Sequence, residues 1–251
     1  MKNLLLSLTF FAMASFANAQ TDEPTNNDGG TQLSESNLNL GIDLQTKYIW
    51  RGMEMITQDA APVVFPSLNY SNKGFYAYVM GGYAFNGKYS EVDLGLSYTY
   101  RWITIGINDY YYPTTTIPQD QYFNFKACET GHWFEALVTI APEKIPVYLT
   151  LSNFFAGADK DLDGNQAYST YAELGGHYSI LNNHQIALAA GMAFNKSCYN
   201  GYAHGAGVCN VELKYTYNLA LKNVNLPLSV AYIINPLYEK AHVNFIASFR
   251  F

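Results

Sequence analysis

Charged side chains recur at alternate positions along this chain, a spacing that places them on one face of extended segments. That face would carry six acids, four fixed bases and one histidine: Asp43, Lys47, Arg51, Glu91, Asp93, Glu135, Glu173, His177, Glu212, Lys214 and Arg250. If the face lines a closed barrel, the charges form a transverse field that selects solutes, with a slight preference for cations. Opposite charges could equally pair across the barrel and fill it, so an open narrow pore and a plugged barrel are both compatible with the sequence.

Nucleophilic catalysis needs a serine, a base within hydrogen-bond reach and an orienting group, and the chain shows no such signature. Its five histidines are His132, His177, His184, His204 and His242. Only His177 lies well inside a predicted extended segment, and Glu173 and Ser179 on the same face would lie roughly 13 and 7 Å from it. We therefore expect no catalytic residue and no cofactor.

An acidic segment matches the first half of a calcium-binding loop of the EF-hand kind. Asp159, Asp161 and Asp163 precede Gly164 at positions 1, 3, 5 and 6 of that pattern. The twelfth position is Thr170 rather than glutamate, so only half of the ligands are present. The three aspartates are thus a calcium candidate, but we favour a solvated acidic turn and expect no metal site.

Three cysteines, Cys128, Cys198 and Cys209, fall in predicted loops or at strand ends. An exported protein can form disulfides. We expect a Cys198–Cys209 bond that closes the glycine-rich segment between them, which would leave Cys128 over, although Cys128 could pair with either cysteine instead. No Cys/His spacing indicates zinc.

The elements that position these residues are predicted from apolar and polar side chains that alternate with period two, the pattern of a strand with two different faces. In residues 91–100, Val92, Leu94 and Leu96 share one face, and Glu91 and Asp93 share the other. Twelve such segments are predicted: 38–52, 62–71, 74–85, 89–100, 102–112, 132–141, 146–156, 167–180, 185–195, 208–221, 225–235 and 241–251. Many exceed the usual soluble strand of about 5 to 6 residues and suit a tilted membrane strand of about 9 to 11.

The fold class predicted is all-β, a transmembrane antiparallel up-and-down β-barrel of about twelve strands, with ten to fourteen possible. Bacterial barrels have an even number of strands, short turns at one end and longer loops at the other. Counting Tyr122–Thr130 as a strand would break that alternation, so we place it in one long outer loop. Aromatic residues near strand ends match membrane-interface girdles: Tyr48 and Trp50, Tyr98 and Tyr100, Tyr215 and Tyr217, Phe249 and Phe251.

Composition supports a barrel outside the cytoplasm. Charged residues make up 14% of the chain, against roughly 25% in soluble domains. The net charge of -6 argues against a nucleic-acid-binding protein, which would carry a strongly basic surface. Residues 1–19 have the features of a signal peptide, residues 20–36 form a flexible polar leader, and the barrel occupies residues 37–251.

Several segments resemble the TorF-type porin family of Gram-negative outer-membrane barrels, most of whose substrates are unassigned. They are Tyr48-Ile49-Trp50-Arg51-Gly52, Gly74-Phe75-Tyr76-Ala77, Glu91-Val92-Asp93-Leu94 and Tyr110-Tyr111-Tyr112-Pro113. The resemblance covers the chain from about residue 40 onward and implies no catalytic residue. Because Arg51 ends the most family-like segment, we expect it either to act in the lumen or to pair with a neighbouring carboxylate at the interface.

The function expected from the sequence is passive diffusion of small hydrophilic solutes through a narrow charged lumen in the cell outer membrane. The alternative is a nonconducting barrel whose outer loops bind a ligand or partner, and an outer-membrane lipid-modifying enzyme ranks third. Expected partners are outer-membrane lipid and the barrel assembly machinery, which would bind the last strand through Phe249 and Phe251. We expect no nucleic-acid partner and assign no oligomeric state.

Overall fold

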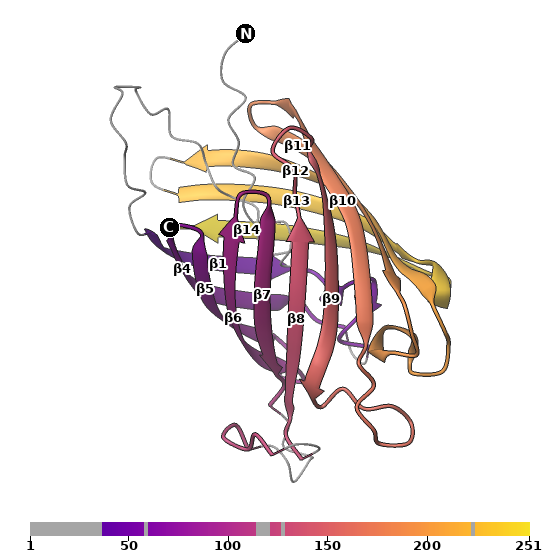
Figure 1. Ribbon diagram of the computed structural model, residues 1–251. Helices are drawn as coiled ribbons and strands as arrows, with labels where there is room; N and C mark the ends of the chain where they lie inside the picture. The colour runs from indigo at the N-terminus through magenta and orange to yellow at the C-terminus, as the bar shows by residue number, and fades with distance from the viewer. Residues whose placement is uncertain (1–36, 58–59, 114–120, 127–128, 222–223) are drawn as a thin grey trace.

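Twelve antiparallel strands close into a barrel in the computed structural model, which describes residues 37–57, 60–113, 121–126, 129–221 and 224–251 (Figure 1). Each strand pairs with the next along the chain, and the first pairs with the last through a register that includes Gly41 opposite Arg250. The strands are β1 (Asn37–Gln45), β4 (Val63–Asn72), β5 (Phe75–Ala84), β6 (Ser90–Tyr100), β7 (Ile103–Tyr111), β8 (His132–Ile140), β9 (Val147–Gly157), β10 (Thr170–Leu181), β11 (His184–Ala193), β12 (Gly207–Leu221), β13 (Val224–Asn235) and β14 (Lys240–Arg250).

The barrel wall has an apolar outside and a polar inside, the reverse of a soluble sheet over a core. On β6 the outward Leu96 is 47% exposed, whereas the inward Ser97 next to it is 4% exposed. The same alternation repeats around the barrel, with Ile105 and Ile107 exposed on β7 and Leu149 and Leu151 exposed on β9. The predicted all-β, twelve-stranded barrel is therefore confirmed.

The two ends of the barrel differ in their connections. At one end, two-residue turns join β4 to β5 and β6 to β7. Lys73 and Gly74 both have positive φ, 47° and 86°, the conformation of the type I′ turn that tight hairpins prefer. The opposite end carries longer connections, of which the one from β9 to β10 and the described part of the one from β7 to β8 extend from the bottom of Figure 1.

Eleven of the twelve strands begin and end within three residues of the predicted bounds, but the first does not. It was expected to continue to residue 52, yet β1 ends at Gln45, and the chain then turns into the barrel. The segment Tyr122–Thr130 contains no strand in the part that the structure describes, residues 122–126 and 129–130, which agrees with its predicted place in a loop.

The inward segment forms a small hairpin of β2 (Ile49–Trp50) and β3 (Met53–Glu54). Its two-residue turn, Arg51 and Gly52, has φ values of 50° and 79°, again the type I′ conformation. Gly52 is required there, because a Cβ atom would overlap the carbonyl oxygen of Cys209 on β12. We call residues 48–56 the lumen hairpin.

The lumen hairpin corrects the assignment of Tyr48 and Trp50 to a membrane-interface girdle. The two residues are 5% and 6% exposed and belong to the buried aromatic cluster inside the barrel. The prediction was wrong because the alternation of apolar and polar residues continues past residue 45, whereas the backbone leaves the barrel wall there and turns back on itself.

In the described ranges, two short 3-10 helices, η1 (Cys198–Asn200) and η2 (Pro236–Tyr238), lie in connections between strands. None of the helices in the described ranges is long and apolar enough to cross a membrane. The predicted signal peptide and leader, residues 1–36, fall outside the described residues.

Candidate functional site

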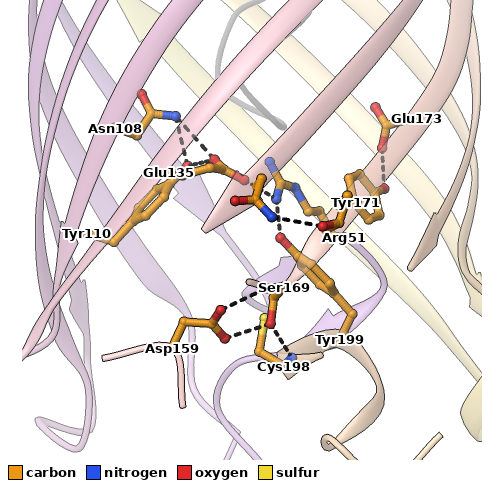
Figure 2. Close-up of polar contacts among 12 residues, drawn as sticks. Arg51, Asn108, Tyr110, Glu135, Asp159, Ser169, Tyr171, Glu173, Cys198 and Tyr199 are labelled. Carbon is orange, nitrogen blue, oxygen red and sulfur yellow. Dashed lines mark hydrogen bonds and ion pairs between the residues drawn. The ribbon is translucent and has the colours of Figure 1, made fainter. Parts of the chain in front are cut away.

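Arg51, at the tip of the lumen hairpin, is the centre of the site. Its Nη1 donates to Glu135 Oε1 on β8 and to the hydroxyl oxygen of Tyr199 in η1, each at 2.5 Å. The guanidinium carbon lies 4.6 Å from the ring centroids of both Trp50 and Tyr171, within the range of cation–π attraction. Figure 2 shows Arg51 between Glu135 on one side and Tyr171 and Tyr199 on the other.

Glu135 is fully buried, and its carboxylate is surrounded by donors. Its Oε2 accepts from the Tyr110 hydroxyl at 2.8 Å and, at 3.4 Å, from Asn108 Nδ2. A buried carboxylate is stable only when it is paired and hydrogen-bonded. Arg51 supplies the charge that balances it, so the hairpin tip is anchored to the opposite wall of the barrel.

Aromatic rings pack around this ion pair and fill one end of the lumen. Trp50 meets Tyr110 edge-on with ring centroids 5.9 Å apart, and it lies 5.6 Å from the ring of Tyr199. The ring of Phe154 on β9 packs against both of these residues, with its centroid 6.3 Å from that of Trp50 and 6.4 Å from that of Tyr199. The lumen is therefore narrowed at the end that carries the long loops.

A second polar cluster holds Tyr199 in place. The buried Asp159 accepts from the backbone N–H and the hydroxyl of Ser169, at 2.8 and 2.6 Å, and from the Tyr202 hydroxyl at 3.0 Å. Ser169 Oγ in turn accepts from the backbone N–H of Cys198 at 2.9 Å (Figure 2). The β9–β10 and β11–β12 connections are thus fixed to each other beside η1.

These contacts do not support the calcium candidate. Asp159 points into the loop cluster, whereas Asp161 Oδ1 accepts from the backbone N–H groups of Asp163 and Asn165, both at 2.9 Å. Asp159 is buried and engaged by the loop cluster, whereas the Asp161 carboxylate caps the acidic turn. Across the described ranges, no group of three or more acidic, histidine or cysteine side chains is arranged to hold a metal ion.

The predicted Cys198–Cys209 disulfide is wrong, because both residues are free thiols. A β-bulge opposite Gly191 and Met192 sets Cys209 against Gly191, with Sγ 3.9 Å from its carbonyl oxygen. Cys198 instead lies beside the Asp159 cluster, where burial raises the pKa of its thiol well above the usual range. Cys128 lies outside the described residues.

The remaining predicted lumen charges fall into pairs and unpaired acids. Arg250 Nη2 lies 2.7 Å from Asp43 Oδ1, Lys214 Nζ lies 3.5 Å from Glu212 Oε1, and Lys47 pairs with Glu54 at 3.2 Å across the base of the hairpin. His177 lies on the lumen side of β10, since its neighbour Tyr178 is exposed outside.

Three lumen acids, Glu91, Asp93 and Glu173, have no basic partner within 4 Å in the described part of the chain. Glu91 and Asp93 share the inner face of β6 and are both buried. Glu91 Oε2 accepts from the hydroxyls of Tyr89, at 2.7 Å, and Tyr48, at 3.4 Å. In the described part of the chain, Glu91 Oε1 and Asp93 Oδ1 are buried without a protein donor, so the two neighbouring carboxyls cannot both be ionised.

One arrangement that the sequence analysis missed lies on the outer face of the barrel. His132 on β8 is buried beneath Tyr122 and Phe125 of the β7–β8 loop. Its Nδ1 is 2.8 Å from Asp109 Oδ1, and its Nε2 is 2.6 Å from the Tyr122 carbonyl oxygen. Both ring nitrogens face acceptors, so the pair must hold an imidazolium or a protonated carboxyl. The pairing of β7 with β8, which places the two strand ends together, is the signal that could have revealed it.

Comparison with known proteins assigns no family to the chain. No family model matches the chain, and no curated protein matches its sequence. The fold is similar to that of a KdgM porin in complex with disordered oligogalacturonate, at 9% identity, covering 86% of this chain and 98% of that chain, with a TM-score of 0.48. It is also similar to the COG4313 outer membrane channel from Pseudomonas putida F1, at 13% identity, covering 90% and 99%, with a TM-score of 0.47.

A third solved structure, the outer membrane channel DcaP of Acinetobacter baumannii, matches at 15% identity over 84% of this chain and 71% of that chain, with a TM-score of 0.32. At these identities and scores we base no functional argument on the likeness. The TorF-type resemblance stays a prediction from the sequence.

Proposed function

We propose that this protein is a porin-like outer-membrane barrel that lets small hydrophilic solutes diffuse through a lumen narrowed by the lumen hairpin. The observation that carries the proposal is the inverted wall, apolar outside and charged inside, on all sides of a closed barrel. A soluble monomer rarely exposes an apolar patch above a few hundred Å², and here the apolar surface encircles the molecule. Lipid is the solvent that such a surface fits.

We further propose that the channel prefers cations. Among the described residues, the ion pairs Arg51–Glu135, Arg250–Asp43 and Lys214–Glu212 cancel charge within the barrel wall and hairpin tip. Glu173 and the Glu91–Asp93 pair are left over. The pair carries at most about one negative charge, because two adjacent buried carboxyls cannot both ionise, and these remaining charges would attract cations into the lumen. The sequence predicted the same direction from the plain count of acids and bases.

A nonconducting barrel is the second candidate function, and the packing of the hairpin is the observation that favours it. Trp50 and Tyr199 are buried where a channel would have its opening. In that case the outer loops would bind a ligand or partner. For catalysis, the His132–Asp109 pair is the arrangement to consider, but Nε2 faces the Tyr122 carbonyl rather than a nucleophile.

Planar-bilayer recording of the purified full-length protein under a KCl gradient tests the proposal. We expect discrete single-channel steps and a reversal potential on the cation-selective side. A correctly folded protein that is electrically silent would support the nonconducting barrel. A reversal potential on the anion side would contradict the role given to the three acids.

We also propose that the barrel assembly machinery recognises the chain through β14. Phe251 is exposed, and Phe249 lies opposite Ile42 where β14 closes onto β1. Replacing both phenylalanines by alanine should lower the amount of folded barrel in the outer membrane without changing the conductance of molecules that do fold.

A further inference from the structure

A small cavity lies in the lumen beside the hairpin, and we propose that it binds the ammonium group of a small cationic solute. Its walls include Arg51 at the hairpin tip, Glu173 on β10, and Asn210, Glu212 and Lys214 on β12. This inference deepens the proposed function, because the cavity opens into the same lumen, but binding can be measured whether or not the barrel conducts.

The cavity exists because β11 presents small side chains to the lumen. Ala187 and Ala189 line it together with Leu188, whose side chain is exposed on the outer face. Two residues further along β11, at Gly191, the hydroxyl of Tyr171 fills the corresponding space. A Cβ atom at Gly191 would overlap that hydroxyl. The cavity volume is about 40 Å³, room for about three water molecules, so it fits a methylammonium-sized group and excludes a sugar ring.

Asn210 supplies the feature that points to a ligand. The residue is buried, and its Nδ2 donates to Glu173 Oε2 at 3.3 Å and to the Tyr171 hydroxyl oxygen at 3.4 Å. Its Oδ1 accepts no hydrogen bond within the described part of the chain. A buried acceptor of this kind needs a donor, and the cavity that Asn210 lines is where the donor would sit.

The charges around the cavity favour a positive donor. Arg51 is balanced by Glu135, and Lys214 faces Glu212 at 3.5 Å. Among the described residues, Glu173 accepts only from neutral donors, the hydroxyls of Tyr148 and Tyr171 at 2.6 Å each and the Asn210 amide at 3.3 Å. One negative charge is therefore left uncompensated beside an unused acceptor.

An ammonium group matches both requirements, since it carries one positive charge and three donors and has no acceptor. Ile49 and Ile233 offer an apolar wall for the attached carbon. A neutral hydroxyl would supply the donor without the charge, so the charge distinguishes the proposed ligand from water or an alcohol.

Isothermal titration of the detergent-solubilised full-length protein with methylammonium chloride tests the inference, with methanol as the uncharged probe of equal size. We expect saturable binding of methylammonium and none of methanol. Ala189→Val fills the cavity and should weaken binding at least tenfold, and Glu173→Gln, which removes the uncompensated charge, should do the same. Ala190→Val, on the outward face of the same strand, is the matched control and should bind as the wild type does.

Each outcome decides the inference. The site is refuted if methylammonium binding does not saturate or is no tighter than methanol binding. It is also refuted if Ala189→Val binds methylammonium as tightly as the wild type does. If Ala189→Val does not fold, Glu173→Gln and the methanol comparison still decide. Methylammonium binding by a protein that is silent in bilayers would support the binding site and refute the channel. Conduction without saturable binding would refute the binding site alone.

Discussion

Replacing Arg51 by methionine should destabilise the barrel by about 3–5 kcal/mol, the cost of leaving a buried charge without its partner. Methionine keeps the hydrophobic contacts with Trp50 and Tyr171 but removes the charge that balances Glu135, which has no exposed surface. The hydroxyl of Tyr110 still donates to the carboxylate, but a neutral donor cannot replace a guanidinium.

The double variant Arg51→Met/Glu135→Gln should be more stable than Arg51→Met alone, because the buried charge has gone together with its partner. Urea unfolding in lipid vesicles, followed by tryptophan fluorescence, measures both free energies of unfolding. Arg101→Met is the control, since Arg101 is exposed in a turn and contacts only the ring of Tyr100 among the interactions described. A loss below about 1 kcal/mol for Arg51→Met, or a double variant as unstable as the single one, would refute the anchoring role of the ion pair.

Three further predictions concern other parts of the molecule. The variant Glu91→Gln/Asp93→Asn should move the reversal potential in a KCl gradient toward zero, and an unchanged potential would remove these acids from the selectivity account. His132→Leu, which leaves Asp109 without its partner, should lower the free energy of unfolding by about 1.5–3 kcal/mol in the same urea assay, and no loss would mean that the outer loop is not held by this pair. Because burial raises the pKa of the half-buried Cys198 thiol, iodoacetamide at pH 7 should label this residue much faster after unfolding, and equally rapid labelling of Cys198 in the folded barrel, detected by mass spectrometry, would contradict this expectation.

The barrel wall was predictable from the sequence because each strand carries its own pattern. Glu91 and Asp93 on one side of β6, and Leu94 and Leu96 on the other, are enough to fix which face meets the lumen. The tight turns also carry local signals, as the Lys73–Gly74 pair between two strands shows. These features depend on neighbours in sequence, which is why their bounds were nearly right.

The lumen hairpin was missed because an alternating pattern cannot distinguish a strand that continues in the wall from one that turns into the lumen. Tyr48 and Trp50 alternate with polar or aliphatic residues in either case. The Arg51–Gly52 pair was the available signal, since a residue followed by glycine suits a type I′ turn. The partner of Arg51 is 84 positions away along the chain, and that distance hid the ion pair from any local pattern.

The central claim, a cation-preferring channel narrowed by the lumen hairpin, is tested most directly by single-channel recording of two proteins side by side. One is the wild type, and the other has residues 48–54 replaced by glycine and serine. We predict small cation-selective steps for the wild type and steps several-fold larger for the variant, because the aromatic rings and Arg51 no longer occupy the lumen. Equal conductance in the two proteins, or a wild type that never conducts, would contradict the account.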